Sequence, residues 1–361
     1  MAPARKGTAV EKGANMSISS EDRPETNSEK GIPVSRPSVE LPGYRWSPAW
    51  VSQVGCLKAA ADYLDVEASV PWLFGVMGYA FLLNIHDELC PSGWHVFNAP
   101  LEEALPHAGL RAQPLLPPGA SPQDRDRLKQ QAWDAVREHL DAGAPCYAYD
   151  LEIGEYYSVY GYDEVGYYYS GPLAEMGKGP LPWNEYGDAS QVGVLAAYAV
   201  GAVEPPEPFH AVRHALLSAV RYAREVEGVS ERYVCGPEGY DQWMEALEFG
   251  RASAHGTAYN AACYHECRAN AVAFLTEARA RLGGLHDDLI DEAQISYREV
   301  AECLERVSRI FSVFDDDLEE KVEDPHHVNT VIEDLRLAKA AEEKGLWTLA
   351  ALAEQLREDL A

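Results

Sequence analysis

The sequence contains few basic residues and no long hydrophobic run. It has 30 Lys and Arg against 58 Asp and Glu among its 361 residues, a formal net charge of -28. A chain with this much negative charge repels phosphate backbones and anionic lipid headgroups. Neither nucleic acid nor a membrane surface is therefore expected as a general partner. No stretch approaches the roughly 20 apolar residues that a membrane helix needs.

The seven cysteines form no CxxC pair, and their number is odd. This spacing argues against a disulfide framework and against a zinc knuckle. Arg5, Lys6 and Lys12 are not followed by the apolar segment of a secretory signal. The sequence therefore predicts a cytoplasmic protein, and we expect neither a metal nor a cofactor.

The composition changes along the chain and predicts three parts. Residues 1–40 are rich in Ser, Glu, Pro, Gly and Lys, so we expect a disordered tail. Residues 41–204 mix helical and strand patterns, and residues 209–361 follow a helical period, with separate helices expected at 328–341 and 346–359. The Pro-rich segment 204–208 is the expected domain boundary, and the fold class is α+β.

Tyrosine-rich runs in the middle of the chain predict an antiparallel sheet. Nine tyrosines fall between positions 147 and 169, in short runs that Gly and Asp separate. Aromatic and β-branched residues favour strands, and their cross-strand pairs stabilise a sheet. We expect strands within 145–151, 155–162, 165–170 and 192–200, and a tyrosine-lined pocket is the alternative interpretation.

Cys56 opens an apolar-periodic stretch and is the leading candidate for a reactive residue. Leu57, Ala60 and Leu64 continue the helical spacing, so we expect the sulfur at a helix N-terminus. There, unpaired N–H groups and the helix dipole lower the pKa of a thiol and favour the thiolate. The alternative is a small buried side chain with no chemical role.

Several short motifs carry a resemblance to a known family. They are Gly78-Tyr-Ala-Phe81, Cys90-Pro-Ser-Gly-Trp94 and the Gly161-Tyr-Asp163 hairpin, together with a cysteine at a helix start. Over residues 45–205 they resemble C39-like papain-fold cysteine peptidases, and most closely the N-terminal domain family of the butirosin-biosynthesis acyltransferase. The resemblance implies a papain-like domain followed by a helical domain, and cysteine-dependent acyl or amide chemistry.

The resemblance places catalytic roles on particular positions. It implies Cys56 as nucleophile and Gln53 as the oxyanion-stabilising glutamine. The histidine position, six residues before Gly161, holds Glu155, and the orienting Asp or Asn position before Pro172 holds Gly171. Because a cysteine nucleophile needs a partner that accepts and returns a proton, this role falls to Glu155, Tyr157 or a nearby histidine, His86 or His95.

Two functions from different classes remain open. The first is cysteine-dependent acyl transfer, or amide or thioester cleavage, on a small biosynthetic or peptidyl substrate, with an acyl carrier protein as one candidate donor. The second is a catalytically degenerate papain-like fold that serves as a ligand- or protein-binding scaffold. The oligomeric state is not predicted.

Helical geometry excludes a metal site at one cluster of potential ligands. In Cys263-Tyr-His265-Glu-Cys267 the two cysteines share a helix face, while His265 points about 200° away from Cys263. The three side chains cannot converge on one ion, so core packing is expected.

Overall fold

A computed structural model describes most of the chain, and the described residues belong to a compact unit that begins at Ser35. They are residues 37–91, 101–117, 124–190, 194–223 and 232–358. Most of the predicted tail therefore lies outside the described residues. Its last two residues, Val39–Glu40, form strand β1 and pair with β5, so the ordered part begins before position 41.

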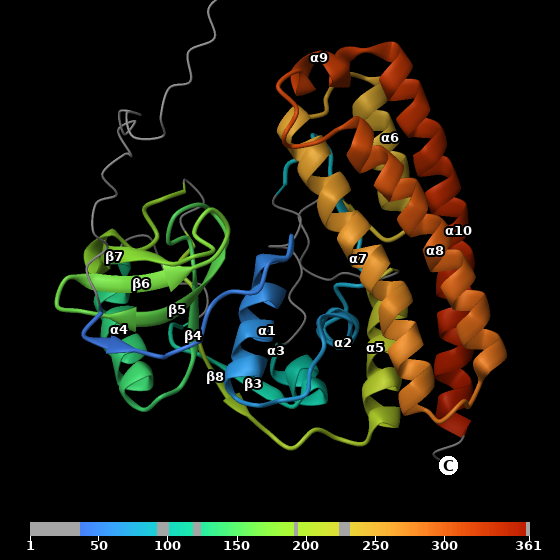
Figure 1. Ribbon diagram of the computed structural model, residues 1–361. Coiled ribbons are helices and arrows are strands. Elements are labelled where there is room, and N and C mark those ends of the chain that lie inside the picture. The colour runs from blue at the N-terminus through green and yellow to red at the C-terminus, as the bar shows by residue number, and fades with distance from the viewer. Residues whose placement is uncertain (1–36, 92–100, 118–123, 191–193, 224–231, 359–361) are drawn as a thin grey trace, which may run out of the picture. The chain divides into compact units, whose positions relative to one another are not determined.

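A seven-stranded antiparallel sheet forms one part of the fold (Figure 1). Its further strands are β3 (Leu110–Pro114), β4 (Cys146–Tyr149), β5 (Tyr156–Tyr162), β6 (Gly166–Ser170), β7 (Lys178–Pro182) and β8 (Ala197–Ala202). The strand order is β3-β8-β4-β5-β6-β7, with β1 beside β5. The predicted antiparallel sheet is confirmed, and β3 and β7 at its edges are additions to the prediction.

Tyrosine rings pack against one another on both faces of this sheet. Tyr147 and Tyr198 are stacked with ring centroids 4.9 Å apart, and they are direct cross-strand partners on β4 and β8. Tyr157 and Tyr169 meet edge to face at 5.3 Å. These contacts show the cross-strand packing that the tyrosine-rich runs predict.

Helices of the first half pack on the sheet and beside it. They are α1 (Ser52–Tyr63), α2 (Val70–Val76), α3 (Leu101–Ala104), the 3₁₀ turn η2 (Leu105–Ala108), α4 (Arg125–Asp141) and the 3₁₀ turn η4 (Trp183–Glu185). Ser69 caps α2 by accepting a hydrogen bond from the Trp72 N–H at 3.0 Å. Trp133 of α4 meets Tyr162 and Tyr167 edge to face, so α4 packs directly on β5 and β6.

The second half of the chain is helical, as predicted (Figure 1). It contains α5 (Pro208–Tyr222), α6 (Glu238–Glu248), α7 (Ala254–Arg281), α8 (Asp287–Ile310), α9 (Leu318–Glu323) and α10 (Pro325–Glu358). The prediction of two separate helices at 328–341 and 346–359 is wrong, because α10 is continuous. Gly345 lies within it, where a Cβ atom would come 2.9 Å from the Tyr297 ring.

The hydrophobic core continues across the Pro-rich segment 204–208. One cluster joins Trp72 and Phe81 of the first half to Phe274 of α7 and Leu349 of α10. A Cβ on Gly75 would lie 2.1 Å from the Phe274 ring, so α2 and α7 touch closely. The segment marks the change from strands to helices but does not separate two cores.

A second core cluster lies among the later helices and also recruits an early strand. Strand β2 (Asn84–His86) pairs antiparallel with β9 (Tyr233–Cys235), and Ile85 packs with Tyr240 and Trp243. Beside it, the buried guanidinium of Arg268 donates to the carboxylate of Glu342 at 2.7 Å and to the carbonyl of Leu82 at 2.7 Å. The Gly236–Gly239 segment follows β9 and includes the first residues of α6.

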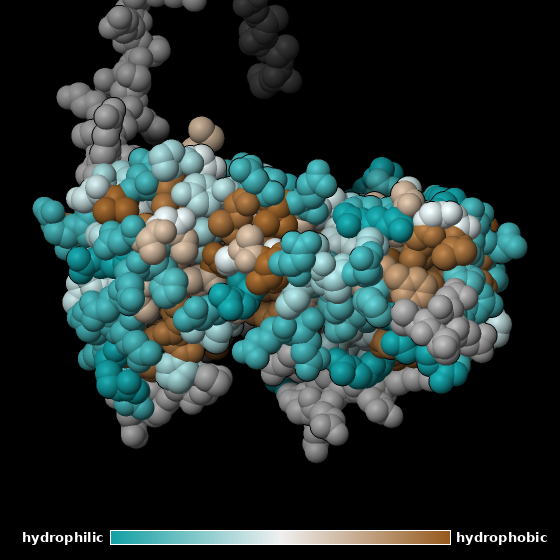
Figure 2. Space-filling model, turned by 90° about the horizontal axis from the view of Figure 1, so that it is seen from below, coloured by the Kyte–Doolittle hydropathy of each residue, from teal (hydrophilic) through white to brown (hydrophobic). Residues whose placement is uncertain are grey.

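Hydrophilic residues cover most of the face seen in Figure 2, and hydrophobic residues gather there in small separate groups. In the described part of the chain, the helices all lack either the length or the apolar character that crossing a bilayer requires.

Candidate functional site

Helix α1 begins four residues before Cys56. Val51 is its N-cap, Ser52 its first residue and Cys56 its fifth, so the predicted position of the sulfur at the helix N-terminus is wrong by about one turn. The difference arises because Ser52, Gln53 and Gly55 add no large apolar side chain to the helical period, so the pattern does not show that the helix includes them. Cys56 is fully buried, at 0 % exposure.

The surroundings of Cys56 disfavour its thiolate. Burial raises the pKa of the thiol far above its usual value; the neighbouring Ser158 side chain offsets this in part, and the Glu155 charge adds to it. A negative charge on this sulfur would also raise the pKa of two neighbouring buried tyrosines, Tyr44 and Tyr147. The environment is therefore the reverse of the electropositive one that activates a cysteine.

The side-chain amide of Gln53 is held by two buried tyrosines. Its Nε2 donates to Tyr147 Oη at 3.2 Å, and its Oε1 accepts from Tyr79 Oη at 2.7 Å. Both polar ends of the amide thus have protein partners. The structure gives Gln53 a role in joining α1 to β4 and to the segment after α2, and its oxyanion role stays a prediction.

Glu155 faces the first turn of α1. Its carboxylate accepts hydrogen bonds from Ser52 Oγ and from Tyr259 Oη of α7. Ser52 Oγ in turn accepts from the Tyr156 N–H at 3.0 Å. Burial raises the pKa of Glu155, and the two hydroxyl donors offset part of the shift. The residue at the predicted histidine position therefore contacts Ser52, which the sequence had not indicated.

Tyr157 has partners other than Ser52 and Tyr259. Its hydroxyl accepts from the Ile153 N–H at 3.2 Å, and its ring fills the space beside Gly171. A Cβ on Gly171 would come 2.3 Å from a Tyr157 ring carbon. The position at which the resemblance implies an Asp or Asn thus has no room for a side chain, and the part of Tyr157 in a site stays a prediction.

Helix α7 also contacts the residues at the start of α1. Glu266 Oε2 accepts a hydrogen bond from the Val51 N–H at 3.1 Å, as expected for a carboxylate at a helix N-terminus. Burial raises the pKa of Glu266, and the Trp50 and Val51 N–H groups lower it in part. The Trp50 ring meets Tyr259 edge to face at 6.1 Å. Two carboxylates and two aromatic rings therefore lie at the first turn of α1, one turn before Cys56.

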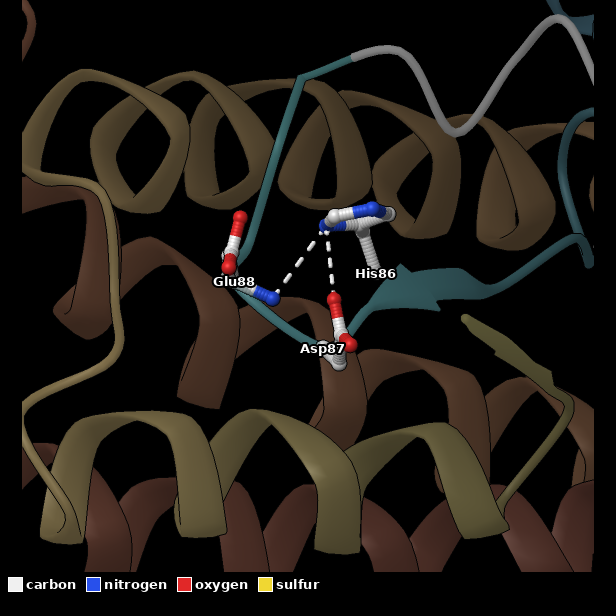
Figure 3. A group of neighbouring side chains, drawn as sticks. All are labelled: His86, Asp87 and Glu88. Carbon is white, nitrogen blue, oxygen red and sulfur yellow. Dashed lines mark hydrogen bonds and ion pairs between the residues drawn. The ribbon is translucent and has the colours of Figure 1, made fainter. Parts of the chain in front are cut away.

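His86 has partners of its own at β2. Its Nδ1 accepts from the Glu88 N–H at 3.2 Å and lies 3.2 Å from Asp87 Oδ1 (Figure 3). Its ring packs edge to face on Tyr233 at 4.9 Å. His95, the other histidine considered as a base, lies outside the described residues.

The ligand atoms of His86, Asp87 and Glu88 lie within 4.8 Å of one another, close enough to suggest a cation site. Arg232 already supplies the cation, since its Nη2 lies 2.8 Å from Asp87 and 2.9 Å from Glu88. Burial lowers the pKa of His86, and the Arg232 charge lowers it further. A metal ion here would have to displace the guanidinium, so this cluster is best described as an ion-pair network.

The cysteines of α7 follow the geometry predicted for a helix. Cys263 and Cys267 are fully buried, while His265 Nδ1 lies 3.1 Å from the carbonyl of Ala301 on α8. The histidine thus faces α8 while both cysteines lie in the core, which agrees with the predicted role in core packing.

Comparison of the sequence with family models and with curated proteins gives no match.

Proposed function

We propose that this chain is a papain-like fold in which the cysteine chemistry is lost and which serves as a ligand- or protein-binding scaffold. The observation that carries the proposal is the burial of Cys56 inside α1, one turn beyond an N-terminus that Glu155 and Tyr259 enclose. The papain-like assignment is supported by a helix that packs on an antiparallel sheet, with residue 155 facing the start of that helix.

Among the residues that the structure describes, three requirements of a thiol enzyme have no counterpart around Cys56. The thiolate is disfavoured, because burial raises the pKa of the thiol. Glu155 raises that pKa further, whereas a histidinium would lower it. Position 171 has no room for a residue that would orient a base. Together these features favour the scaffold over the thiol enzyme.

Thiol alkylation tests the proposal. The intact protein is treated with iodoacetamide at about pH 6, where an ordinary thiol of pKa about 8.5 is almost wholly protonated. The labelling rate of Cys56 is compared with its rate in urea and with that of partly exposed Cys235. We expect Cys56 to react more slowly in the folded protein than in urea. Faster labelling in the folded protein would falsify the proposal.

A second candidate is the acyl transfer, or amide or thioester cleavage, that the resemblance implies. One observation favours an enzyme here: Ser52 is the first residue of α1, and its hydroxyl is bonded to Glu155, a carboxyl whose pKa burial raises. Ser52 would then attack the acyl carbon in place of Cys56. Glu155 would take the hydroxyl proton and return it to the leaving group.

An activated ester separates the two candidates. The protein is incubated with p-nitrophenyl acetate, and the acetylated residue is identified by mass spectrometry in the wild type, Ser52→Ala and Cys56→Ala. Acetyl-Ser52 that disappears in Ser52→Ala supports a hydroxyl enzyme, and acetyl-Cys56 supports the thiol enzyme. Acetylation confined to exposed lysines supports the scaffold.

A further inference from the structure

Two histidine rings are stacked where the 3₁₀ turn η2 meets helix α5. The ring centroids of His107 and His214 lie 4.4 Å apart, and the two ring planes differ by 26°. Two neutral imidazoles can stack in this way, whereas two imidazolium ions at this distance repel each other. The contact therefore depends on how many protons the pair of rings holds.

The backbone brings these two rings together. His107 lies in η2, which ends directly before β3, and α5 begins after β8. Strands β3 and β8 pair with each other, and the Val203 N–H donates to the carbonyl of Gly109 at 2.9 Å. The indole N–H of Trp72 donates to the carbonyl of His107 at 3.1 Å. The stack therefore joins one edge of the sheet to the first helix of the helical half.

The polar atoms of the two rings meet no group that would hold an added proton. Within the described part of the chain, the buried Nδ1 of His107 has no hydrogen-bond partner. The Nε2 of His214 lies 3.5 Å from the neutral hydroxyl of Ser218. A proton added to His107 would leave a buried N–H without an acceptor and a positive charge without a counter-ion, and both are costly. The structure thus stabilises the neutral form of the stack.

Burial and the neighbouring charges act in the same direction. Burial, together with the His214 and His210 rings, lowers the pKa of His107 to about 4. Burial also lowers the pKa of His214, while Glu103 of α3 opposes that shift and Arg221 of α5 adds to it. Because both pKa values are lowered, a chain in which this contact is open takes up protons first as the pH falls. The stabilisation by the closed contact is therefore complete above about pH 6.5 and decreases as the pH falls toward about 4.

The other elements that pack against η2 and α5 are α2, β3, α7 and α10. Helix α2 has no titratable side chain, and Arg111 of β3 is exposed. Arg281 of α7 and Arg357 of α10 are each paired with a glutamate, and α5 itself also carries Arg213. Glu103 is exposed, so water weakens its attraction for a protonated ring. These surroundings supply more positive than negative charge, which opposes protonation of the stack.

We propose that the stack of His107 on His214 is an acid-sensitive contact, which holds η2 against α5 near neutral pH and separates, with uptake of protons, below about pH 6. The opening is local. It frees η2 and the adjoining part of α5, while the core cluster of the later helices, which contains neither histidine, stays closed. The contact lies outside the group at the start of α1, so it does not depend on the function proposed for that group.

Hydrogen exchange of the full chain, followed by mass spectrometry, tests the contact at about pH 7.5 and about pH 5, on either side of the ordinary histidine pKa. Peptides that cover η2 and α5 report the opening, and α6 is the reference because it contains no histidine. The rates are corrected for the pH dependence of exchange in an unfolded chain. The variants are His107→Gln and His214→Gln, and exposed His326→Gln is the matched control. Circular dichroism verifies that each variant is folded.

We expect the protection of η2 and α5, relative to α6, to be about 10-fold lower at the acidic pH, because each unit by which a pKa is lowered corresponds to a factor of ten. His326→Gln should behave like the wild type, and the decrease should be smaller in His107→Gln and His214→Gln. NMR of labelled histidines should show two rings of the wild type that titrate below the ordinary range, one of them missing from each of these two variants.

Three results on the wild type would overturn the proposal, whether or not the variants fold. They are unchanged protection of η2 and α5, an equal loss of protection in α6, and the absence of any histidine that titrates below the ordinary range. An undiminished decrease in folded His107→Gln or His214→Gln would overturn it as well, because the opening would then not depend on the stack.

Discussion

The Ser52 hydroxyl donates a hydrogen bond to the Glu155 carboxylate across 103 residues of sequence. The bond joins the first residue of α1 to the residue directly before β5, and the Tyr156 N–H completes the group by donating to the same hydroxyl. Together with Tyr259 from α7, it connects the sheet, the first helix and the longer helices at one point.

Replacement of Ser52 by alanine tests this connection. Ser52→Ala leaves Glu155 with the Tyr259 donor alone and leaves the Tyr156 N–H without its acceptor, and an unpaired group in a buried place costs about 1–3 kcal/mol. We expect the free energy of unfolding, measured in urea, to fall by an amount in that range. Thr330→Ala removes an exposed hydroxyl on α10 and should change it by less than about 0.5 kcal/mol. Equal effects of the two variants would contradict the connection.

Glu155 should make the folded state less stable as pH rises. Its pKa is raised above the ordinary 4.5, so above that pH the unfolded chain loses the proton first. The stabilising contribution of Glu155 is thus present below about pH 4.5 and is lost as pH rises through the higher folded-state pKa. Glu155→Gln should lack this decline. The measurement is urea unfolding of both proteins across this range, with exposed Glu320→Gln as control, and parallel pH profiles would show the prediction to be wrong.

The buried Arg268–Glu342 pair should be costly to break on one side. Arg268→Met leaves Glu342 buried without its cation, and we expect a loss of about 3–5 kcal/mol in the free energy of unfolding. The double variant with Glu342→Leu should be more stable than Arg268→Met alone, because no uncompensated charge remains. If the loss in the double variant equalled the sum of the losses in Arg268→Met and Glu342→Leu, the two side chains would not interact. Removing the exposed Arg357–Glu354 pair should cost at most about 1 kcal/mol.

Gly75 should tolerate no side chain. Gly75→Ala places a methyl group 2.1 Å from the Phe274 ring, so α2 and α7 must move apart, and overpacking of this kind costs about 1–3 kcal/mol. Gly201→Ala is the matched control, because a Cβ there meets nothing within 4 Å. Thermal unfolding is measured for both variants and for the wild type. We expect the Tm to fall below that of the wild type in Gly75→Ala and to stay unchanged in Gly201→Ala.

Local patterns predicted the fold class and most of the elements. The tyrosine-rich runs became β4, β5 and β6 because aromatic alternation describes a sheet that is packed on both faces. Strand β7 was missed because Gly179 and Pro180 are poor strand formers, although an edge strand tolerates proline. The break expected in α10 failed because Gly345 serves a close contact with Tyr297 and does not end the helix.

The candidate site was less predictable, because long-range contacts decide it. Glu266 lies 215 residues from the Val51 N–H that it binds, and nothing near either residue in the sequence signals the contact. Serine is favoured at helix starts, so Ser52 offers a local signal for the start of α1, although Val51 is the N-cap in the structure. The apolar period that begins at Cys56 predicts a helix start one turn too late. The sequence shows Glu155 and Gly171 at the positions where the resemblance implies a histidine and an Asp or Asn, and the structure gives a steric reason for the glycine.

The Tyr157 ring beside Gly171 bears on any attempt to install hydrolytic activity by design. A glycine-to-aspartate change there collides with the aromatic carbons, so a histidine placed at 155 would gain no orienting neighbour from it. Engineering must first shrink residue 157 and repack its contact with Tyr169. The order of substitutions, and not merely their identity, would govern success.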